Sequence, residues 1–208
     1  MRPRRKKHGG ERRDACSDII ITGNNQIRTK PVTIEIGCGK GRFISQLATR
    51  NPEKYYIAIE KVSDIIVLAA EKIKTENITN VDFICDDVKN LLNYFGENEV
   101  DSIYLNFSDP WPKAGHHKRR LTYKSFLEIY RYILTDNGTI YLKTDNRPLF
   151  DFSIEQLSEN GFTVENITYD LHNSEFNTNN IVTEYETNFS AKGFAINRLE
   201  ARLFPAVD

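Results

Sequence analysis

Long hydrophobic runs are absent from this 208-residue sequence, which has no stretch of about 18 consecutive apolar residues that could span a bilayer. No apolar segment with a small-residue cleavage site follows the charged N-terminus, so we expect no secretory signal and a cytoplasmic location. Cysteine is also scarce. The three cysteines have neither CxxC nor Cys/His metal spacing, so we expect reduced thiols and no metal site.

The formal net charge is only −1, but the charge is unevenly distributed. Residues 1–13 hold seven basic residues and the single acid Glu11, which gives +6, so the other 195 residues sum to −7. A basic arm of this kind suits contact with a phosphate backbone, and a solvated, disordered terminus explains it equally well. We therefore divide the chain into a basic arm and lead-in, residues 1–30, and one globular domain, residues 31–208.

From Val32 onward, short β-rich runs alternate with longer helical stretches, a pattern that indicates an α/β fold with a largely parallel sheet. The expected strands are residues 32–36, 55–59, 81–85, 102–107 and 139–143. The expected helices are residues 43–49, 63–76, 123–134 and 149–160. After Gly161, two further β-like runs, residues 164–169 and 184–189, lie on either side of a polar stretch, residues 173–180, that we expect to be a loop.

A glycine-rich segment, Ile34-Glu-Ile-Gly-Cys-Gly-Lys-Gly41, follows the first expected strand. Its glycines allow the backbone to turn sharply beside a ligand. A dinucleotide site carries GxGxxG, with the pyrophosphate at a helix N-terminus, whereas the spacing here is GxGxG. Glu35 would repel a pyrophosphate and suits a ligand that carries an ammonium group and a sulfonium. A nicotinamide-dependent dehydrogenase is therefore the least favoured of the alternatives.

Two further acids stand at the ends of expected strands. Glu60 ends the second strand, where a carboxylate can bind both ribose hydroxyls, and Asp87 follows the third, where it could lie beside an adenine. Each feature alone is also typical of a tight turn or a helix cap. In this order, the three features resemble the class I S-adenosylmethionine-dependent methyltransferases.

That resemblance implies a Rossmann-like α/β fold, a mostly parallel seven-stranded sheet with helices on both faces and a reversed C-terminal hairpin. The two runs after Gly161 could supply the hairpin. It also implies that S-adenosyl-L-methionine is the methyl donor and S-adenosyl-L-homocysteine the product.

The segment Asn106-Phe-Ser-Asp-Pro-Trp-Pro-Lys113 follows the fourth expected strand, at the sheet edge where open α/β folds bind ligands. Its two prolines cannot continue the strand and predict a rigid loop that holds Asp109, Trp111 and Lys113 in set directions. Trp111 is the only tryptophan. Base stacking and a role as a buried anchor both remain open for it.

A second basic cluster, His116-His-Lys-Arg-Arg-Leu121, comes next. Together with Thr144-Asp-Asn146 and Thr183-Glu-Tyr-Glu186, these segments resemble the bacterial tRNA (guanine-N7)-methyltransferase family over about residues 32–198. Members of that family often carry Arg where this chain has Gly115. The resemblance implies methyl transfer to N7 of guanosine 46 in the tRNA variable loop, forming 7-methylguanosine. The implied partner is tRNA, with no membrane or metal, and the chain would act as a monomer or homodimer.

The resemblance also implies roles for particular residues. The cofactor-binding positions are Glu35, Gly37, Gly39, Glu60, Asp87 and Asp109, and Asp109 is also the catalytic residue. The choice of Asp87 over its neighbour Asp86 follows the family register. The substrate-binding positions are Lys113, Asp145, Thr183, Glu184, Tyr185 and Glu186. The RNA contacts are His116, Lys118, Arg119 and Arg120.

Two other functions compete with this interpretation. The SDPW letters loosely resemble the proline-aromatic motifs of enzymes that methylate exocyclic amino groups of adenine or cytosine, but Asp109 and the TEYE segment argue against that chemistry. A non-catalytic RNA-binding module that had lost its cofactor would not be expected to keep Glu35, Glu60 and Asp109.

Overall fold

The computed structural model describes residues 9–23, 31–190 and 193–203. The basic residues between positions 2 and 7 of the predicted arm lie outside this part of the chain. The helices are α1 (Gly9–Asp14), α2 (Arg42–Arg50), α3 (Ser63–Thr75), η1 (Val88–Asn93), η2 (Ala114–Arg119), α4 (Lys124–Ile133), α5 (Arg147–Glu159), η3 (Leu171–Asn173), η4 (Glu175–Asn179) and α6 (Glu184–Ser190), where η marks a 3₁₀ helix. The strands are β1 (Ile20–Ile21), β2 (Val32–Ile36), β3 (Tyr56–Ile59), β4 (Val81–Ile84), β5 (Val100–Asn106), β6 (Leu134–Thr144), β7 (Phe162–Thr168) and β8 (Asn197–Leu203).

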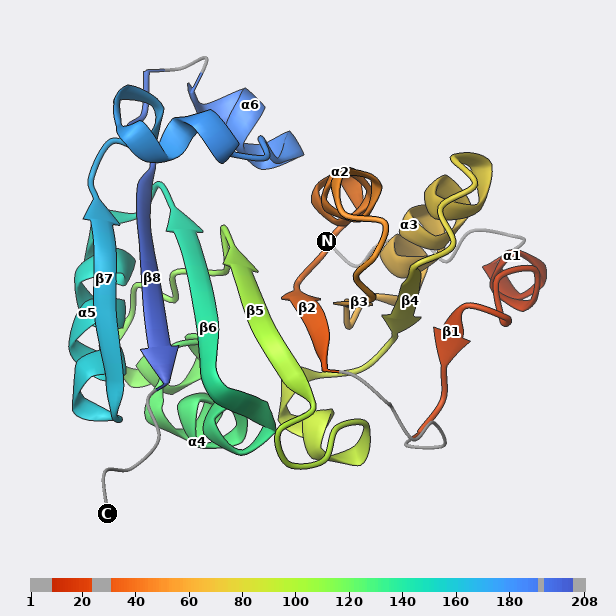
Figure 1. Ribbon diagram of the computed structural model, residues 1–208, viewed down its shortest axis with the longest axis horizontal. Helices are drawn as coiled ribbons and strands as arrows, with labels where there is room; N and C mark the ends of the chain where they lie inside the picture. Colours follow the sequence, from red (N-terminus) through yellow and green to blue (C-terminus); the bar gives the residue numbers. More distant parts are fainter. Residues whose placement is uncertain (1–8, 24–30, 191–192, 204–208) are drawn as a thin grey trace.

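The described strands form one sheet in the order β1-β4-β3-β2-β5-β6-β8-β7 (Figure 1). Neighbouring strands pair in parallel, except that β8 is antiparallel to both β6 and β7. The strand order changes direction between β2 and β5, and a sheet of this kind binds ligands at such a switch point, beyond the carboxyl ends of the strands. The predicted Rossmann-like α/β fold with a reversed C-terminal hairpin is confirmed. The described sheet has eight strands instead of seven because β1 pairs with the edge of β4.

The core has two layers, one on each face of the sheet. In β3, Ile57 and Ile59 belong to the layer that α4 and α5 cover, whereas Tyr56 and Ala58 belong to the layer of α2 and α3. All four side chains are buried, as expected for a central parallel strand with helices on both sides. None of the helices in the described residues is long and apolar enough to cross a membrane.

The structure corrects the prediction for residues 184–189, which form helix α6 instead of a strand. The physical reason is a capping box at the start of that helix. Thr183 Oγ1 accepts a hydrogen bond from the Glu186 backbone N–H at 3.0 Å, and Glu186 Oε2 accepts one from the Thr183 N–H at 3.3 Å. The predicted run at residues 164–169 corresponds to β7, and its partner in the hairpin is β8 instead of residues 184–189.

Two smaller differences concern the neighbouring segments. Strand β6 begins at Leu134, earlier than the predicted residue 139, because Leu134 pairs with Val100 before the register shifts. Asn137 accommodates the irregularity with a left-handed backbone, φ 65°. The polar stretch at residues 173–180, predicted to be a loop, contains all of η4 and the last residue of η3.

Candidate active site

A cavity of about 550 Å³ opens at the carboxyl ends of β2, β3, β4 and β5. Each of these strands contributes residues at its end. The lining includes Gly37 after β2, Glu60 after β3, Asp86 and Asp87 after β4, and Asn106 to Asp109 at the end of β5. The wall is completed by side chains from the segment that follows, namely Trp111, Arg119, Leu121 and Phe126. The structure therefore brings together four of the predicted cofactor-site residues at the switch point of the sheet.

The glycine-rich segment forms the turn between β2 and α2. Gly37 and Gly39 have positive φ angles of 79° and 54°, and a Cβ at either position would meet nothing within 4 Å. At Gly41 a Cβ would instead lie 2.9 Å from the Ala69 Cβ on α3. The first two glycines therefore leave open space beside the turn, whereas Gly41 allows helices α2 and α3 to pack closely.

Glu35 is a buried acid directly beneath this turn, with 2% of its surface exposed. Its Oε1 accepts a hydrogen bond from Asn106 Nδ2 at 3.2 Å, but no described group makes a hydrogen bond of normal geometry with Glu35 Oε2 or Asn106 Oδ1. Burial raises the pKa of Glu35 to about 7, an effect opposed by the Asn106 bond and the charge of Lys143. A buried acceptor without a donor is costly, so this pair favours a ligand that brings a cation or an N–H group.

The acids after β3 and β4 lie on the cavity wall in different environments. Glu60 is half-buried, and its Oε1 accepts a hydrogen bond from the backbone N–H two residues later at 3.0 Å. Both oxygens of Asp86 are bonded within the protein, to Asn90 Nδ2 at 2.8 Å and to the Tyr94 hydroxyl at 2.9 Å. Asp87 is exposed and caps η1. Of the two adjacent acids, Asp87 is therefore the freer to bind a ligand.

The loop after β5 has a strained backbone. Phe107 and Trp111 have left-handed φ angles of 53° and 41°, which residues with a Cβ rarely adopt. Arg120 holds this loop in place. Its Nε donates to the Pro110 carbonyl at 2.8 Å, its Nη2 donates to the Trp111 carbonyl at 3.4 Å, and its guanidinium lies 4.5 Å from the centre of the Phe152 ring.

This arrangement argues against the predicted RNA contact by Arg120. Only 4% of this residue is exposed, because its guanidinium is used to fix the loop from inside. The rest of the predicted RNA-contact cluster lies on or near the surface beside the cavity. The Arg119 guanidinium stacks 4.9 Å from the centre of the Trp111 ring, and His116 meets that ring edge-on at 5.9 Å. Lys113 and Lys118 are exposed.

The structure divides the predicted Thr183-Glu-Tyr-Glu186 substrate segment into two pairs. Thr183 and Glu186 are buried and form the capping box, and the Glu186 carboxylate is bonded to protein groups only. This arrangement argues against a direct substrate contact by these two side chains. Glu184 and Tyr185 are exposed, and Glu184 pairs with the ammonium of Lys40 at 2.8 Å.

Tyr185 connects α6 to the rest of the site. Its ring centre lies 4.8 Å from that of Phe107, and its hydroxyl donates a hydrogen bond to Asp145. Burial, followed by the Asp145 charge and this hydrogen bond, raises the pKa of Tyr185. Asp145, Tyr185 and the strained loop after β5 therefore lie together.

Lys143 is the functional candidate that sequence reasoning missed. The sequence places it at the end of an expected strand, and its three hydrogen bonds to segments beyond residue 179 could not be read from the local pattern. The available signal was a lysine within an otherwise apolar and β-rich run, where a charge needs a buried partner. In the described part of the chain, no three His, Cys, Asp or Glu side chains are grouped as a metal site would require.

Known proteins resemble this chain over most of its length. A family model described as a putative methyltransferase matches residues 29–199. A tRNA (guanine-N(7)-)-methyltransferase from Brevibacillus brevis is 47% identical over 179 residues, 86% of this chain and 82% of that protein. Proteins of the same name from Macrococcus caseolyticus and Streptococcus mutans are 48% and 42% identical over 188 and 211 residues. These matches cover 90% and 97% of this chain and 88% and 100% of the relatives.

Solved structures agree on the fold. The 16S rRNA methyltransferase KamB superposes with a TM-score of 0.62 at 13% identity, covering 85% of this chain and 89% of that one. An S-adenosylmethionine-dependent methyltransferase from Aquifex aeolicus gives a TM-score of 0.57 at 14% identity, covering 93% and 89%. The fold is thus that of the class I S-adenosylmethionine-dependent methyltransferases. Within that class, the extent of the sequence matches places this chain in the tRNA (guanine-N7)-methyltransferase family.

Proposed function

We propose that this chain transfers the methyl group of S-adenosyl-L-methionine to N7 of guanosine 46 in the tRNA variable loop. The products are 7-methylguanosine and S-adenosyl-L-homocysteine. The observation that carries the proposal is one cavity that joins the glycine turn, Glu60 and Asp87 to Asp109, with Trp111 on its wall. The names of the three bacterial relatives support the choice of tRNA and of N7.

The residues at the strand ends fit the parts of this cofactor. Glu35 and Asn106 offer buried acceptor oxygens that make no hydrogen bond of normal geometry in the described structure, which suits an ammonium group. Glu60 would hold the ribose hydroxyls and Asp87 would lie at the adenine, while Gly37 and Gly39 leave space for close approach. When bound, S-adenosyl-L-methionine supplies a methyl group made electrophilic by its sulfonium.

Guanine N7 has an in-plane lone pair and no proton, so the chain does not need a strong general base. What its residues must do is orient the base, and alignment alone can lower a barrier by roughly 7–11 kcal/mol in the best cases. Positive charge develops on the guanine ring as the bond forms. The Asp109 carboxylate, on the cavity wall after β5, would stabilise that charge most strongly in the transition state.

Recognition of guanine requires a match for its N1–H and N2–H donors. A single carboxylate can accept from both, provided that the base is unpaired or extruded. Because Glu186 is buried and both of its oxygens are bonded within the protein, the more accessible acids Asp145 and Glu184 are the ones that remain for this role.

The backbone of tRNA would meet the basic residues beside the cavity. Lys113, Lys118 and Arg119 present charge there, and His116 packs against Trp111. Of the predicted arm, Arg12 is committed to the protein, since its Nε donates to Glu71 on α3 at 2.6 Å. We propose that the rest of the arm, in residues 1–30, adds phosphate contacts to a methyltransferase domain at residues 31–208. We also propose that the protein acts in the cytoplasm, as a monomer or homodimer.

Nucleoside analysis tests the proposed chemistry. The purified chain is incubated with methyl-labelled S-adenosyl-L-methionine and an unmodified tRNA transcript, and the transcript is then digested to nucleosides. Label in 7-methylguanosine supports the proposal. Label in N6-methyladenosine or N4-methylcytidine would instead establish exocyclic amino methylation, and binding of both ligands without any label would favour a non-catalytic module.

A further inference from the structure

Lys143 is a buried cation at the carboxyl end of β6, with 8% of its side chain exposed. Its ammonium donates three hydrogen bonds, to Glu186 Oε2 at 2.7 Å, to the Ile181 carbonyl at 2.9 Å and to Asn180 Oδ1 at 3.0 Å. These bonds use all three of its protons. All of its partners belong to the segment that leads into α6 or to α6 itself, so Lys143 ties that helix to the sheet.

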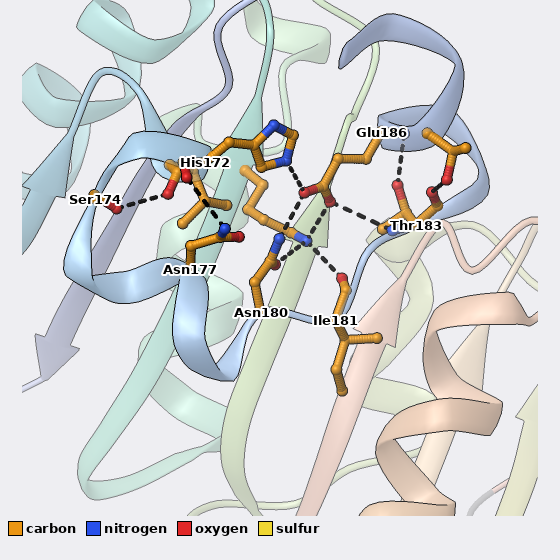
Figure 2. A network of polar contacts seen from close by, with 10 residues as sticks. His172, Ser174, Asn177, Asn180, Ile181, Thr183 and Glu186 are labelled. Atoms are coloured by element: carbon orange, nitrogen blue, oxygen red, sulfur yellow. Dashed lines mark hydrogen bonds and ion pairs between the residues drawn. The ribbon is translucent and has the colours of Figure 1, made fainter. Parts of the chain in front are cut away.

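The Glu186 carboxylate is the partner of Lys143 in this buried ion pair and has no exposed surface. Figure 2 shows it between His172, Asn180 and the start of α6. Its Oε1 lies 2.8 Å from His172 Nε2 and 2.7 Å from Asn180 Nδ2, while its Oε2 caps α6 at Thr183. Burial alone would raise the pKa of Glu186, but the Lys143 charge and these hydrogen bonds outweigh that effect and lower it. Both oxygens are thus fully engaged by protein donors.

The Lys143–Glu186 ion pair also fixes the distance between the segments that carry the proposed base-recognition residues. Asp145 follows Lys143 by two residues at the end of β6, and Tyr185 precedes Glu186 by one on α6. Fixing Lys143 to Glu186 therefore brings together the two segments whose side chains meet in the Tyr185–Asp145 hydrogen bond. Figure 1 shows the same relation at the scale of the fold, with α6 beyond the ends of β5 and β6.

Buried ion pairs contribute little net stability, and their best-attested value is to specify one arrangement among several. The helix that this pair holds is only seven residues long, too short to be stable by itself in water. Its position therefore depends on tertiary contacts.

We propose that Lys143 is a positioning residue for the acceptor base, acting through Glu186 to set α6 so that Tyr185 and Asp145 stand beside the loop that carries Asp109. Lys143 does not touch the guanine in this arrangement. The proposal rests on the proposed function, and it reassigns Glu186 from base recognition to support of the helix.

Replacement of Lys143 by Met removes the charge and keeps a flexible chain of similar length. We expect kcat with tRNA to fall between about 10-fold and 10²-fold, the scale seen when a reacting group is misplaced by about 1 Å. The dissociation constant for S-adenosyl-L-methionine should stay within about twofold. Lys143→Arg, which keeps a cation, should recover most of the lost kcat. Asn80→Ala is the matched control, because it removes bonds to three carbonyls at the opposite edge of the sheet and should leave kcat unchanged.

A double-mutant cycle separates positioning from general destabilisation. Tyr185→Phe should lower kcat in the otherwise native chain but have little further effect beside Lys143→Met, because Tyr185 is then already displaced. Additive losses, or normal kcat in Lys143→Met, would overturn the proposal. If circular dichroism shows that Lys143→Met does not fold, Glu186→Gln takes its place with the same expected pattern. Failure of the native chain itself to make 7-methylguanosine would contradict the proposed function instead.

Discussion

At the scale of single residues, Glu35 has the most unusual environment in the proposed cofactor site. It is fully buried, one of its oxygens makes no hydrogen bond of normal geometry with a described group, and burial raises its pKa to about 7. The charges that face it are the Lys143 ammonium, which lowers the pKa, and the Glu60 carboxylate, which raises it. A ligand that brings a positive charge close to Glu35 would favour its ionised form and lower the pKa.

This environment predicts that cofactor affinity rises with pH. In the free chain Glu35 is largely protonated below pH 7, so binding a cationic ligand must release a proton there. Affinity should therefore increase up to about pH 7 and then level off, before the ligand's own amino group titrates near pH 8. Isothermal titration calorimetry in buffers of different ionisation enthalpy measures both the affinity and the proton release. Glu35→Gln should bind more weakly and without proton release, and a pH-independent affinity in the native chain would contradict this role.

Asp109 is expected to act in the chemical step. Asp109→Ala should lower the single-turnover rate by about 10²–10³-fold, as when a preorganised electrostatic group is removed, with S-adenosyl-L-methionine binding largely intact. Asp101→Ala is the control, since Asp101 is an exposed acid near the other end of the same strand. A rate for Asp109→Ala close to that of the native chain would remove Asp109 from the catalytic role.

At the scale of elements, the loop after β5 shows how adjacent arginines acquire different roles. Arg119 stacks on Trp111 at the surface, whereas Arg120 turns inward to the carbonyls of Pro110 and Trp111. Arg120 thus holds a loop whose backbone is strained, because the non-glycine residues Phe107 and Trp111 have positive φ angles. Such strain persists only where the surrounding contacts enforce it.

Substitution of Arg119 and of Arg120 should therefore affect different properties, tRNA binding in the first case and stability in the second. Arg119→Ala should reduce the slope of log affinity for tRNA against log salt by about one unit, with the free energy of unfolding changed by less than about 0.5 kcal/mol. Arg120→Ala should lower the free energy of unfolding by about 1–3 kcal/mol, because it leaves loop carbonyls without donors. It should also lower turnover while leaving the salt slope unchanged. Filter binding across a salt series and urea denaturation measure the two effects, and a reversed pattern would refute the assignment.

The sequence predicts those elements whose local pattern agrees with their tertiary setting. A buried strand such as β3, with the sequence Tyr-Ile-Ala-Ile, is predicted from its apolar run, and the acids after β3 and β4 line one cavity at one edge of the sheet. Residues 184–189 have an alternating pattern that also fits a strand, and the capping box decides in favour of a helix. Strand β8 is missed because its charged residues pair with neighbouring strands, as the ion pair between Arg202 on β8 and Glu165 on β7 shows.

The part of the site that escaped prediction depends on contacts distant in sequence. Lys143 and Glu186 are 43 positions apart, and only the fold shows that they neutralise each other. The inward turn of Arg120 is likewise invisible in a run of basic residues, where every member looks equally suited to RNA.

At the scale of the whole molecule, the sheet gathers side chains from distant segments at one edge, with the cavity bounded by strand ends and by the loop after β5. The charge distribution suits a polyanionic partner that approaches this edge. The chain outside residues 1–13 sums to −7, so non-specific attraction to RNA over the whole surface is disfavoured. Basic residues beside the cavity would then orient the tRNA toward Asp109, with the +6 arm as an additional contact.

Methylation of N7 at guanosine 46 is tested by two matched tRNA transcripts that differ only in having guanine or adenine at position 46. Each is incubated with the purified chain and labelled S-adenosyl-L-methionine, and the modified position is mapped after nucleoside analysis. We expect 7-methylguanosine at position 46 in the guanine transcript and no label in the adenine transcript. Equal labelling of both transcripts, or label in any other nucleoside, would contradict this expectation.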